Sequence, residues 1–303
     1  MEQTPKQKIN IVSNGDESLA SHRMRCSIPC EMLNLYSNYE VKITDEFDEN
    51  SNINIFHKHF NKQKNLSDAI MGADVSRIVF DICDDWFDRE HGKYYEDMCE
   101  LADVITCHSI NMQSRIYEAT GRLAQIAADP ITFPFHPATD PATDPKVVWY
   151  GHSSNLFSVM PYAEKIRNLT IITNVMLPHS KATSKVWKPN LVENSIDLYD
   201  IVIIPKIHTP EAKNKSPNRA VDALHAGRFV IAESEEVYGE LMGGAFIGPI
   251  EEGLTFYKNN PDKVKEMIER GQQYVLDNYN PRTVCDQWVR ALNYVDYSKF
   301  EGP

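Results

Sequence analysis

Short apolar runs of four to six residues recur along the chain and alternate with segments in which apolar residues return every three or four positions. Runs of the first kind are typical of strands buried on both faces, and segments of the second kind of amphipathic helices. The predicted strands are residues 8–13, 39–43, 53–57, 77–81, 103–107, 131–133, 147–150, 169–174, 201–204, 229–232 and 245–247. The clearest predicted helices are residues 19–35, 109–120, 218–226, 236–241, 261–278 and 283–293. This alternation predicts parallel βαβ units.

A proline-rich segment, residues 133–146, divides the alternation into two halves and has no apolar periodicity of its own. Such a segment is typical of a stiff linker. We therefore expect an N-terminal Rossmann-like domain over residues 1–140 and a C-terminal one over residues 146–280. A length of 303 residues fits two domains. Two doubly wound halves of this kind predict a cleft, with ligands at the carboxyl ends of the strands.

The composition is that of an ordinary globular protein, with 42% hydrophobic and 24% charged residues. No apolar run approaches the roughly 20 residues needed to cross a bilayer, and the first residues do not resemble a secretory signal. The six cysteines contain no CxxC pair. We therefore expect reduced thiols and a cytoplasmic protein.

The formal net charge of −12 argues against non-specific nucleic-acid binding. Residues 205–219 are an exception, because four cations stand there against one carboxylate, a net charge of +3. This basic island lies between a predicted strand and a predicted helix, and the amides and dipole of a helix start attract anions. We expect a diphosphate here, with Asp222 one turn further on accepting hydrogen bonds from ribose hydroxyls; a solvated loop is the alternative. The predicted donor contacts in this segment are Lys206, Lys213, Lys215, Ser216, Asn218, Arg219 and Asp222.

Residues 200–232 resemble the donor-binding segment of GT-B glycosyltransferases, especially glycosyltransferase family 4 and its relatives. The letters DALHAGRFVI stand where that family has the pattern EAxxxGxxVV. The opening KINIVSNGDESLASHRMR, the segments RIVFDICDDWFD and VVWYGHSSN and the final NPRTVCDQWVRAL are also similar to that family. The resemblance implies a GT-B fold, in which two Rossmann-like domains face a cleft. It also implies that residues 281–303 form a C-terminal helix that crosses back to the first domain.

The same resemblance implies a glycosyltransferase that moves a sugar from a nucleotide-diphosphate sugar, bound mainly by the C-terminal half, to a saccharide or another hydroxyl acceptor. It implies that no metal or other cofactor is required, and it favours retention of the anomeric configuration. The first of two family glutamates is replaced by Asn214, while Asp222 matches the second. The identity of the transferred sugar is therefore left open.

Two other functions compete with this one. A phage-type glycosyltransferase acting on hydroxymethylated DNA bases is disfavoured by the net charge of −12. A non-catalytic nucleotide-sugar-binding GT-B module is favoured only by the loss of the first glutamate at Asn214.

The loop after the first strand contains Gly15 and Asp16, and Arg23 and Arg25 follow on the next helix. Gly15 would let the backbone approach the donor or the acceptor, with both arginines facing phosphate and Asp16 near the acceptor. The alternative is an ordinary strand-to-helix turn.

Three further strand ends carry candidate groups. His57 could be a general base, could hold the sugar, or could be structural. Asp85 belongs to a carboxylate cluster after the fourth predicted strand, for which we weigh an acceptor-side or catalytic role, an acidic turn and a metal site. We place the metal last, because the spacing is not Asp-x-Asp. Gly151 and His152 would let the diphosphate approach closely, or form a tight turn.

Overall fold

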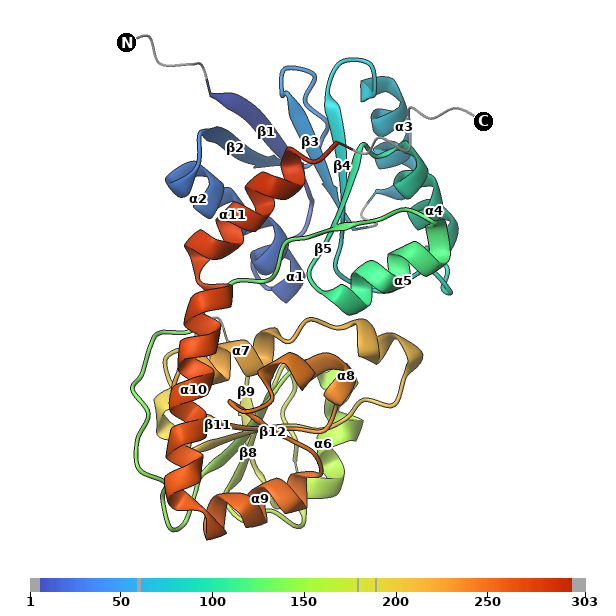
Figure 1. The fold of residues 1–303 in the computed structure, drawn as a ribbon. Helices are drawn as coiled ribbons and strands as arrows, with labels where there is room; N and C mark the ends of the chain where they lie inside the picture. Colours follow the sequence, from blue (N-terminus) through green and yellow to red (C-terminus); the bar gives the residue numbers. More distant parts are fainter. Residues whose placement is uncertain (1–5, 59–60, 179, 189, 296–303) are drawn as a thin grey trace, which may run out of the picture. The chain divides into compact units, whose positions relative to one another are not determined.

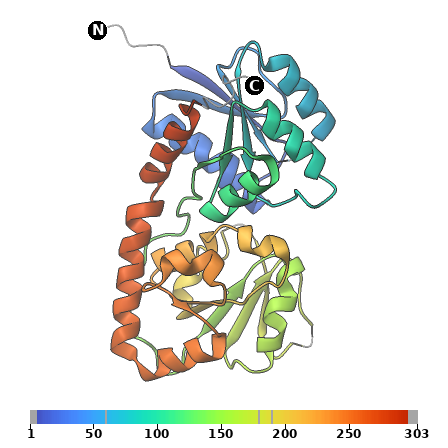
Figure 2. The ribbon, with the colours of Figure 1, turned by 45° about the vertical axis from the view of Figure 1, so that its right-hand side comes forward.

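The computed structural model describes residues 6–58, 61–178, 180–188 and 190–295. The chain forms two α/β units, each with a parallel sheet between helices (Figures 1 and 2). Unit 1 comprises Met1–Pro130, Asn214–Ser216 and Pro281–Pro303, and unit 2 comprises Ile131–Lys213 and Pro217–Asn280. The proline-rich residues 133–146 have no regular secondary structure and group with unit 2.

Unit 1 contains a six-stranded parallel sheet in the order β2-β1-β3-β4-β5-β6. Its strands are β1 (Gln7–Val12), β2 (Tyr39–Thr44), β3 (Ile53–His57), β4 (Arg77–Ile82), β5 (Val104–Cys107) and β6 (Gln125–Ile126). Strands β3 and β5 are buried at every position, as the uninterrupted apolar runs predicted.

Helices cover both faces of this sheet (Figure 1). One face carries α3 (Lys62–Gly72), α4 (Gly92–Leu101) and α5 (Ile110–Thr120), and the other carries α1 (Ala20–His22), η1 (Arg23–Ser27), α2 (Ile28–Tyr36) and α11 (Pro281–Leu292). Helix α5 is capped at both ends, because the Ser109 hydroxyl accepts from the Met112 amide and Gly121 has a φ of 71°. The single helix predicted over residues 19–35 is interrupted by η1, a π-helical turn.

Unit 2 contains a second six-stranded parallel sheet, in the order β12-β11-β10-β7-β8-β9. Its strands are β7 (Val147–Tyr150), β8 (Leu169–Thr173), β9 (Thr183–Val186), β10 (Ile201–Ile204), β11 (Phe229–Ala232) and β12 (Phe246–Ile247). The four central strands are buried throughout, whereas β9 is an edge strand with partly exposed side chains.

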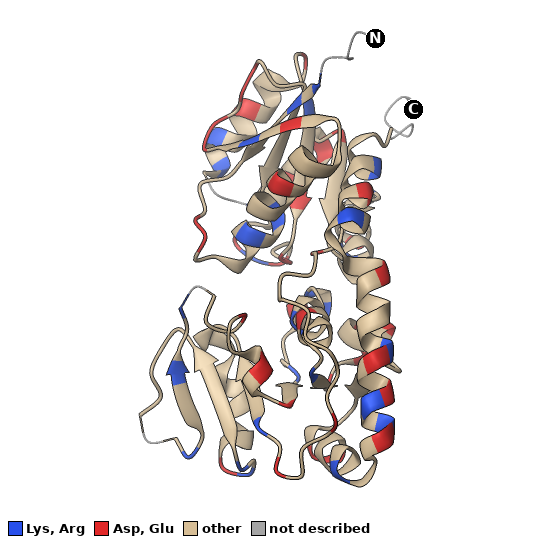
Figure 3. Cartoon of the chain, turned by 90° about the vertical axis from the view of Figure 1, so that its left-hand side faces the viewer, with Lys and Arg blue, Asp and Glu red and all other residues tan. Residues whose placement is uncertain are grey.

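The helices of unit 2 are α6 (Leu156–Ala163), α7 (Asn218–His225), α8 (Glu235–Tyr238), α9 (Ile250–Asn259) and α10 (Pro261–Tyr279), with short 3₁₀ turns η2 (Ser153–Asn155), η3 (Ile196–Leu198), η4 (Pro210–Asn214) and η5 (Gly239–Leu241). Pro261 occupies the first turn of α10, where proline is favoured because its missing amide would have no partner in the helix. Figure 3 shows charged residues recurring along α10, while its buried positions include Val264, Ile268 and Val275. In the described part of the chain, none of the helices combines the length and the apolar character that a membrane span requires.

Three sequence predictions differ from this structure. Residues 131–133 are not a strand, because the Ile131 amide donates to the Tyr279 carbonyl and the next two amides donate to a side chain of α7. The two edge strands β6 and β9 were not predicted, since each is short and lacks a long apolar run. The returning helix ends at Leu292, and residues 296–303 of the predicted range lie outside the described residues.

Candidate functional site

In each sheet the direction of strand addition reverses at one point. In unit 1, β1 lies between β2 and β3, and in unit 2, β7 lies between β8 and β10. Ligands of doubly wound sheets bind at the carboxyl ends of strands flanking such a point. The predicted site residues follow β1, β3 and β4 in unit 1 and β7 and β10 in unit 2, so each group lies at the edge where a ligand is expected.

In unit 2, Arg219 lies at the end of β7. Its Nη1 donates to the Tyr150 carbonyl at 3.3 Å, and the Tyr150 hydroxyl donates to the Arg219 carbonyl at 2.9 Å. A Cβ added to Gly151 would lie 3.0 Å from the Trp149 ring and 3.5 Å from Nη1 of Arg219. The glycine therefore leaves room for the Trp149 ring, and the guanidinium lies at ordinary contact distance beside it, so the structure brings the predicted pair Gly151 and Arg219 together.

Two other predicted donor residues lie at the same edge of unit 2. His152 is exposed, and its Nδ1 is 3.0 Å from the Ser154 hydroxyl. Lys206 is exposed, and its amide donates to Oε2 of Glu233 at 3.0 Å. Each is the second residue after the end of a central strand, β7 for His152 and β10 for Lys206.

Glu233 was missed by the sequence reasoning, although it directly follows β11. Besides the Lys206 amide, its carboxylate accepts the Tyr162 hydroxyl at 2.8 Å and the Ile250 amide at 3.1 Å. One side chain thus joins α6, the end of β10 and the first turn of α9. It fixes the backbone from which the Lys206 side chain extends.

Asp222 lies inside unit 2 with 3% exposure. Its Oδ1 accepts the Thr132 amide at 2.7 Å and the Phe133 amide at 3.3 Å, and its Oδ2 accepts the Thr132 hydroxyl at 2.9 Å. Burial raises the pKa of Asp222 to about 7, against the opposing effect of these three donors. In this structure the carboxylate therefore holds the segment after Ile131.

The remaining donor candidates surround the start of α7. Lys213 and Lys215 are exposed, and Ser216 and Asn218 are partly exposed. Residues Asn214–Ser216 group with unit 1, where the Lys215 ammonium lies 2.7 Å from Oδ1 of Asp84. Lys215 is therefore held by a carboxylate here.

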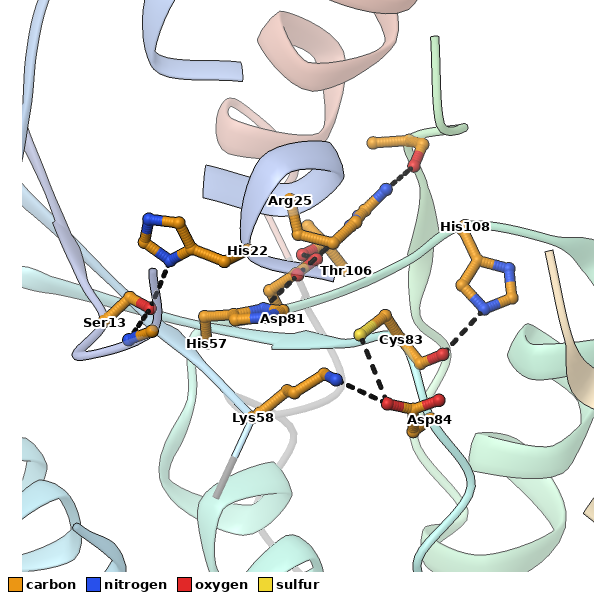
Figure 4. Close-up of polar contacts among 12 residues, drawn as sticks. Ser13, His22, Arg25, His57, Lys58, Asp81, Cys83, Asp84, Thr106 and His108 are labelled. Carbon is orange, nitrogen blue, oxygen red and sulfur yellow. Dashed lines mark hydrogen bonds and ion pairs between the residues drawn. The ribbon is translucent and has the colours of Figure 1, made fainter. Parts of the chain in front are cut away.

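In unit 1, polar side chains cross three neighbouring strands. The register pairs His57 with Asp81 and Asp81 with Thr106, so the three side chains share one face of the sheet. Nδ1 of His57 lies 3.0 Å from Oδ2 of Asp81, and the Thr106 hydroxyl donates to Oδ1 at 2.7 Å (Figure 4). All three are fully buried, and burial lowers the pKa of His57 despite the effect of Asp81.

Arg25 completes this cluster. The sequence predicted that it faces a phosphate, but its side chain points into the interior of unit 1. The side chain is 1% exposed, and its guanidinium bonds to Asp81 at 2.6 Å and to Asp129 at 3.1 Å. The π-helical turn η1 carries it to this position, and its Cζ lies 4.8 Å from the ring centre of Trp288. Burial alone would raise the pKa of Asp81, but Arg25 and His57 hold that pKa well below its usual range.

Lys58 is a second feature that the sequence did not reveal. Its backbone has a φ of 58°, a left-handed conformation uncommon outside glycine, so the strand alternation stops at this residue. Its ammonium lies 2.5 Å from Oδ2 of Asp84, after β4 (Figure 4). Burial alone would raise the pKa of Asp84, but Lys58 and Lys215 hold it well below its usual range.

The loop after β1 is packed against His22. Nδ1 of His22 lies 3.0 Å from the Ser13 hydroxyl, which also accepts the Gly15 amide at 3.3 Å (Figure 4). A Cβ at Gly15 would lie 2.9 Å from Nδ1 of His22. The glycine therefore lets the loop lie against the imidazole.

The other candidates in this loop are Asp16 and Arg23. Asp16 is exposed and accepts the amide and the hydroxyl of Ser18, and these bonds lower the pKa of its carboxyl. Nη1 of Arg23 donates to the Glu17 carbonyl at 2.6 Å. Both residues therefore lie at the carboxyl edge of unit 1, and both help to fix the loop.

Asp85 follows β4 and has a side chain that is 7% exposed. Its Oδ2 accepts from Nε of Arg115 at 3.0 Å and from Nδ2 of the Asn214 side chain at 2.8 Å. Within residues 6–58, 61–178, 180–188 and 190–295, no three His, Cys, Asp or Glu side chains come together in an arrangement that could hold a metal ion.

Two of the solved structures that match are similar to nearly the whole chain, and a third is similar to most of it. An α-glucosyltransferase in complex with UDP-glucose and DNA containing an abasic site matches with a TM-score of 0.66 and 8% identity, over 95% of this chain and 99% of that one. The lipopolysaccharide outer core galactosyltransferase WaaB matches with a TM-score of 0.61 and 11% identity, over 97% and 100%. TarM of S. aureus, in complex with UDP and two saccharides, matches with a TM-score of 0.59 and 12% identity, over 80% and 55%.

No protein-family model matches the sequence, and no curated protein matches it. The two parallel six-stranded sheets and the whole-chain structural matches nonetheless give the fold class. The chain has the GT-B fold, as its sequence predicted.

Proposed function

We propose that this protein is a glycosyltransferase that takes a sugar from a nucleotide-diphosphate sugar bound at the carboxyl edge of unit 2. The fold supports this, because two of the similar structures contain UDP-glucose or UDP. The observation that carries the proposal is the position of Arg219, whose guanidinium lies beside Gly151 at the reversal point of the sheet. A cation next to a glycine turn suits a diphosphate.

The chemistry asks for positive charge at this edge. When the bond between the sugar and the diphosphate breaks, negative charge grows on the departing phosphate, and fixed cations and amides stabilise it. We assign this role to Arg219 together with His152, Gly151, Lys206, Lys213 and Asn218 of unit 2. Lys215 and Ser216 were also predicted as donor contacts, but they group with unit 1, and Lys215 would first have to leave Asp84. The ribose contact proposed for Asp222 requires its carboxylate to leave Thr132, because both of its oxygens are engaged there.

The acceptor, a saccharide or another hydroxyl compound, is proposed to bind at unit 1 near Asp16, His57 and Asp85, which are the proposed catalytic groups. His57 is fully buried against Asp81, so its role requires it to be uncovered. Gly15 and Arg23 remain proposed contacts of the donor phosphate. We further propose that transfer needs no metal ion and that the protein belongs to glycosyltransferase family 4 or a relative, with retention of configuration.

Release of nucleoside diphosphate from a panel of nucleotide sugars tests the proposal, with oligosaccharides and hydroxymethylated duplex DNA as acceptors. The informative variants are Arg219→Ala and Arg219→Lys, with Arg270→Ala, an exposed residue of α10, as the matched control. Losing a preorganised cation should lower turnover about 10²- to 10³-fold. Lysine should restore part of it, because it keeps the charge without the fork of donors.

Three results would count against the proposal. Equal turnover of Arg219→Ala and the control would remove the diphosphate site from this edge. Donor binding without any product, over all acceptors, would indicate a binding module. Turnover lost to a chelator and restored by a divalent cation would refute the metal-free mechanism.

A further inference from the structure

Besides residues 205–219, a second segment of unit 2 is basic in this acidic protein. Residues 165–188 contain five cations and no carboxylate, whereas the whole chain has a net charge of −12. The rest of the chain therefore carries −12 − 5 = −17. These cations, which we call the basic edge, are Lys165, Arg167, Lys181, Lys185 and Lys188.

The basic edge follows the outermost strand of the sheet. Lys185 lies in β9, with Lys181 before the strand and Lys188 after it, while Lys165 and Arg167 precede β8. Basic residues on β9 and its neighbouring loops are visible at one edge of unit 2 (Figure 3). Among the described residues, Lys181 pairs with Glu164 and Lys165 with Glu251, and the Lys185 ammonium donates to the Tyr199 hydroxyl.

Four exposed apolar side chains lie on the segments that border β8 and β9, two of them at the end of β8 where Lys188 also lies and opposite the end that Lys165 and Arg167 precede. Val175 and Met176 follow β8 with 39% and 59% exposure, and Phe157 and Met160 project from α6 with 54% and 39%. None of them is needed for the core of unit 2, which the inner side of α6 covers with Val159 and Ala163.

Hydrogen bonds and an ion pair join these segments into one surface. The Leu177 amide donates to the Ser184 hydroxyl at 3.0 Å, so the apolar loop lies against β9. The Trp187 amide donates to the Thr173 carbonyl at 2.7 Å. The ion pair between Lys181 and Glu164, at 2.5 Å, holds the start of β9 against the end of α6.

We propose that this surface docks unit 2 onto a membrane whose surface is anionic. Cations attract anionic headgroups, and neighbouring apolar side chains gain free energy when they enter the interface between headgroups and acyl chains. The phosphates of a nucleic acid would bind the cations alone, since they make no favourable contact with the apolar side chains of Val175 and Met176. Lysines on an edge strand also prevent edge-to-edge pairing, but that role accounts for Lys185 and not for Arg167 or Met176.

Co-sedimentation of the full chain with vesicles tests the proposal without any donor or acceptor. We expect binding to vesicles of phosphatidylcholine with phosphatidylserine, weakening as salt rises, and none to phosphatidylcholine alone. The double variant Arg167→Gln/Lys188→Gln should bind about 25-fold more weakly, from about fivefold per cation. The matched control Lys258→Gln/Lys263→Gln removes two exposed charges from α9 and α10 and should bind as the parent does.

A third variant separates the apolar contribution. Met176→Ser keeps every charge and should still weaken binding to anionic vesicles, whereas a purely electrostatic surface would not respond. Absence of binding at low salt, or equal loss in the control variant, would overturn the proposal. Displacement by duplex DNA at equal phosphate concentration would assign the surface to nucleic acid instead. Sugar transfer to a soluble acceptor is measured separately, so failure of one proposal leaves the other intact.

Discussion

The carboxylate of Asp222 offers the sharpest test of whether a predicted ligand contact is structural. It is buried in unit 2, and three donors from Thr132 and Phe133 point at its two oxygens. Asp222→Asn keeps an oxygen for the two amides and places an NH₂ group opposite the Thr132 hydroxyl, which can accept. Asp222→Ala leaves all three donors without their acceptor.

The expected magnitudes follow from these contacts. Each buried donor without an acceptor costs about 1–3 kcal/mol, so the loss of the acceptor for three donors in Asp222→Ala should lower the unfolding free energy by roughly 3–9 kcal/mol. Because the pKa of Asp222 is about 7 in the folded chain and 3.8 in its ordinary state, the folded state retains a proton that the unfolded state loses. This stabilisation is complete below pH 4 and is lost as pH rises to 7, by roughly 4 kcal/mol.

Urea unfolding, followed by tryptophan fluorescence between pH 4 and 8, measures both effects. Asp222→Asn should unfold with nearly the parent's stability at pH 4 and should lack the decline towards pH 7. Glu269→Gln, an exposed position in α10, is the control and should keep the decline. The reasoning fails if Asp222→Asn shows the parent's pH slope. A fully stable Asp222→Ala that no longer binds nucleotide would return the carboxylate to the ribose.

Two further predictions concern stability. Gly121 and Gly227 both have a φ near 70°, but a Cβ meets nothing at Gly121 and would lie 2.4 Å from a backbone oxygen at Gly227. Gly121→Ala should therefore lower the unfolding free energy by about 1 kcal/mol and Gly227→Ala by about 3 kcal/mol or more. Equal losses in thermal unfolding would contradict this. Arg25→Met breaks a buried ion pair and should lower the unfolding free energy by about 3–5 kcal/mol. Adding Asp81→Asn to the same chain should restore part of that free energy. If the losses of the two single variants simply add in urea unfolding, the two charges do not interact.

The fold was predictable because its strands are buried on both faces and read as unbroken apolar runs. Strands β3, β7, β10 and β11 have the bounds that their runs predicted. The edge strands β6 and β9 were not predicted, because a short or half-exposed strand does not need an unbroken apolar run.

The site was predictable only as far as strand ends could be located. That His57 and Asp85 follow strands is visible in the sequence, but the contact between His57 and Asp81 depends on β3 and β4 being neighbours in a particular register. The inward position of Arg25 depends on a π-helical turn, and that of Lys58 on a left-handed backbone. Neither conformation has a signature in residue type, so the sequence shows that these charges are present but does not predict where their side chains lie.

The return of α11 to unit 1 has a consequence for how the protein is made. Trp288 and Cys285 of this helix are fully buried, and the ring of Trp288 covers Arg25. A ribosome delivers residues 281–292 only after all of unit 2 has been synthesised. Until then the nascent unit 1 leaves its Arg25 cluster uncovered, so unit 2 can mature first although it is translated second. A nonsense mutation near codon 280 should therefore impair the folding of unit 1, most of which is encoded far upstream of the mutation.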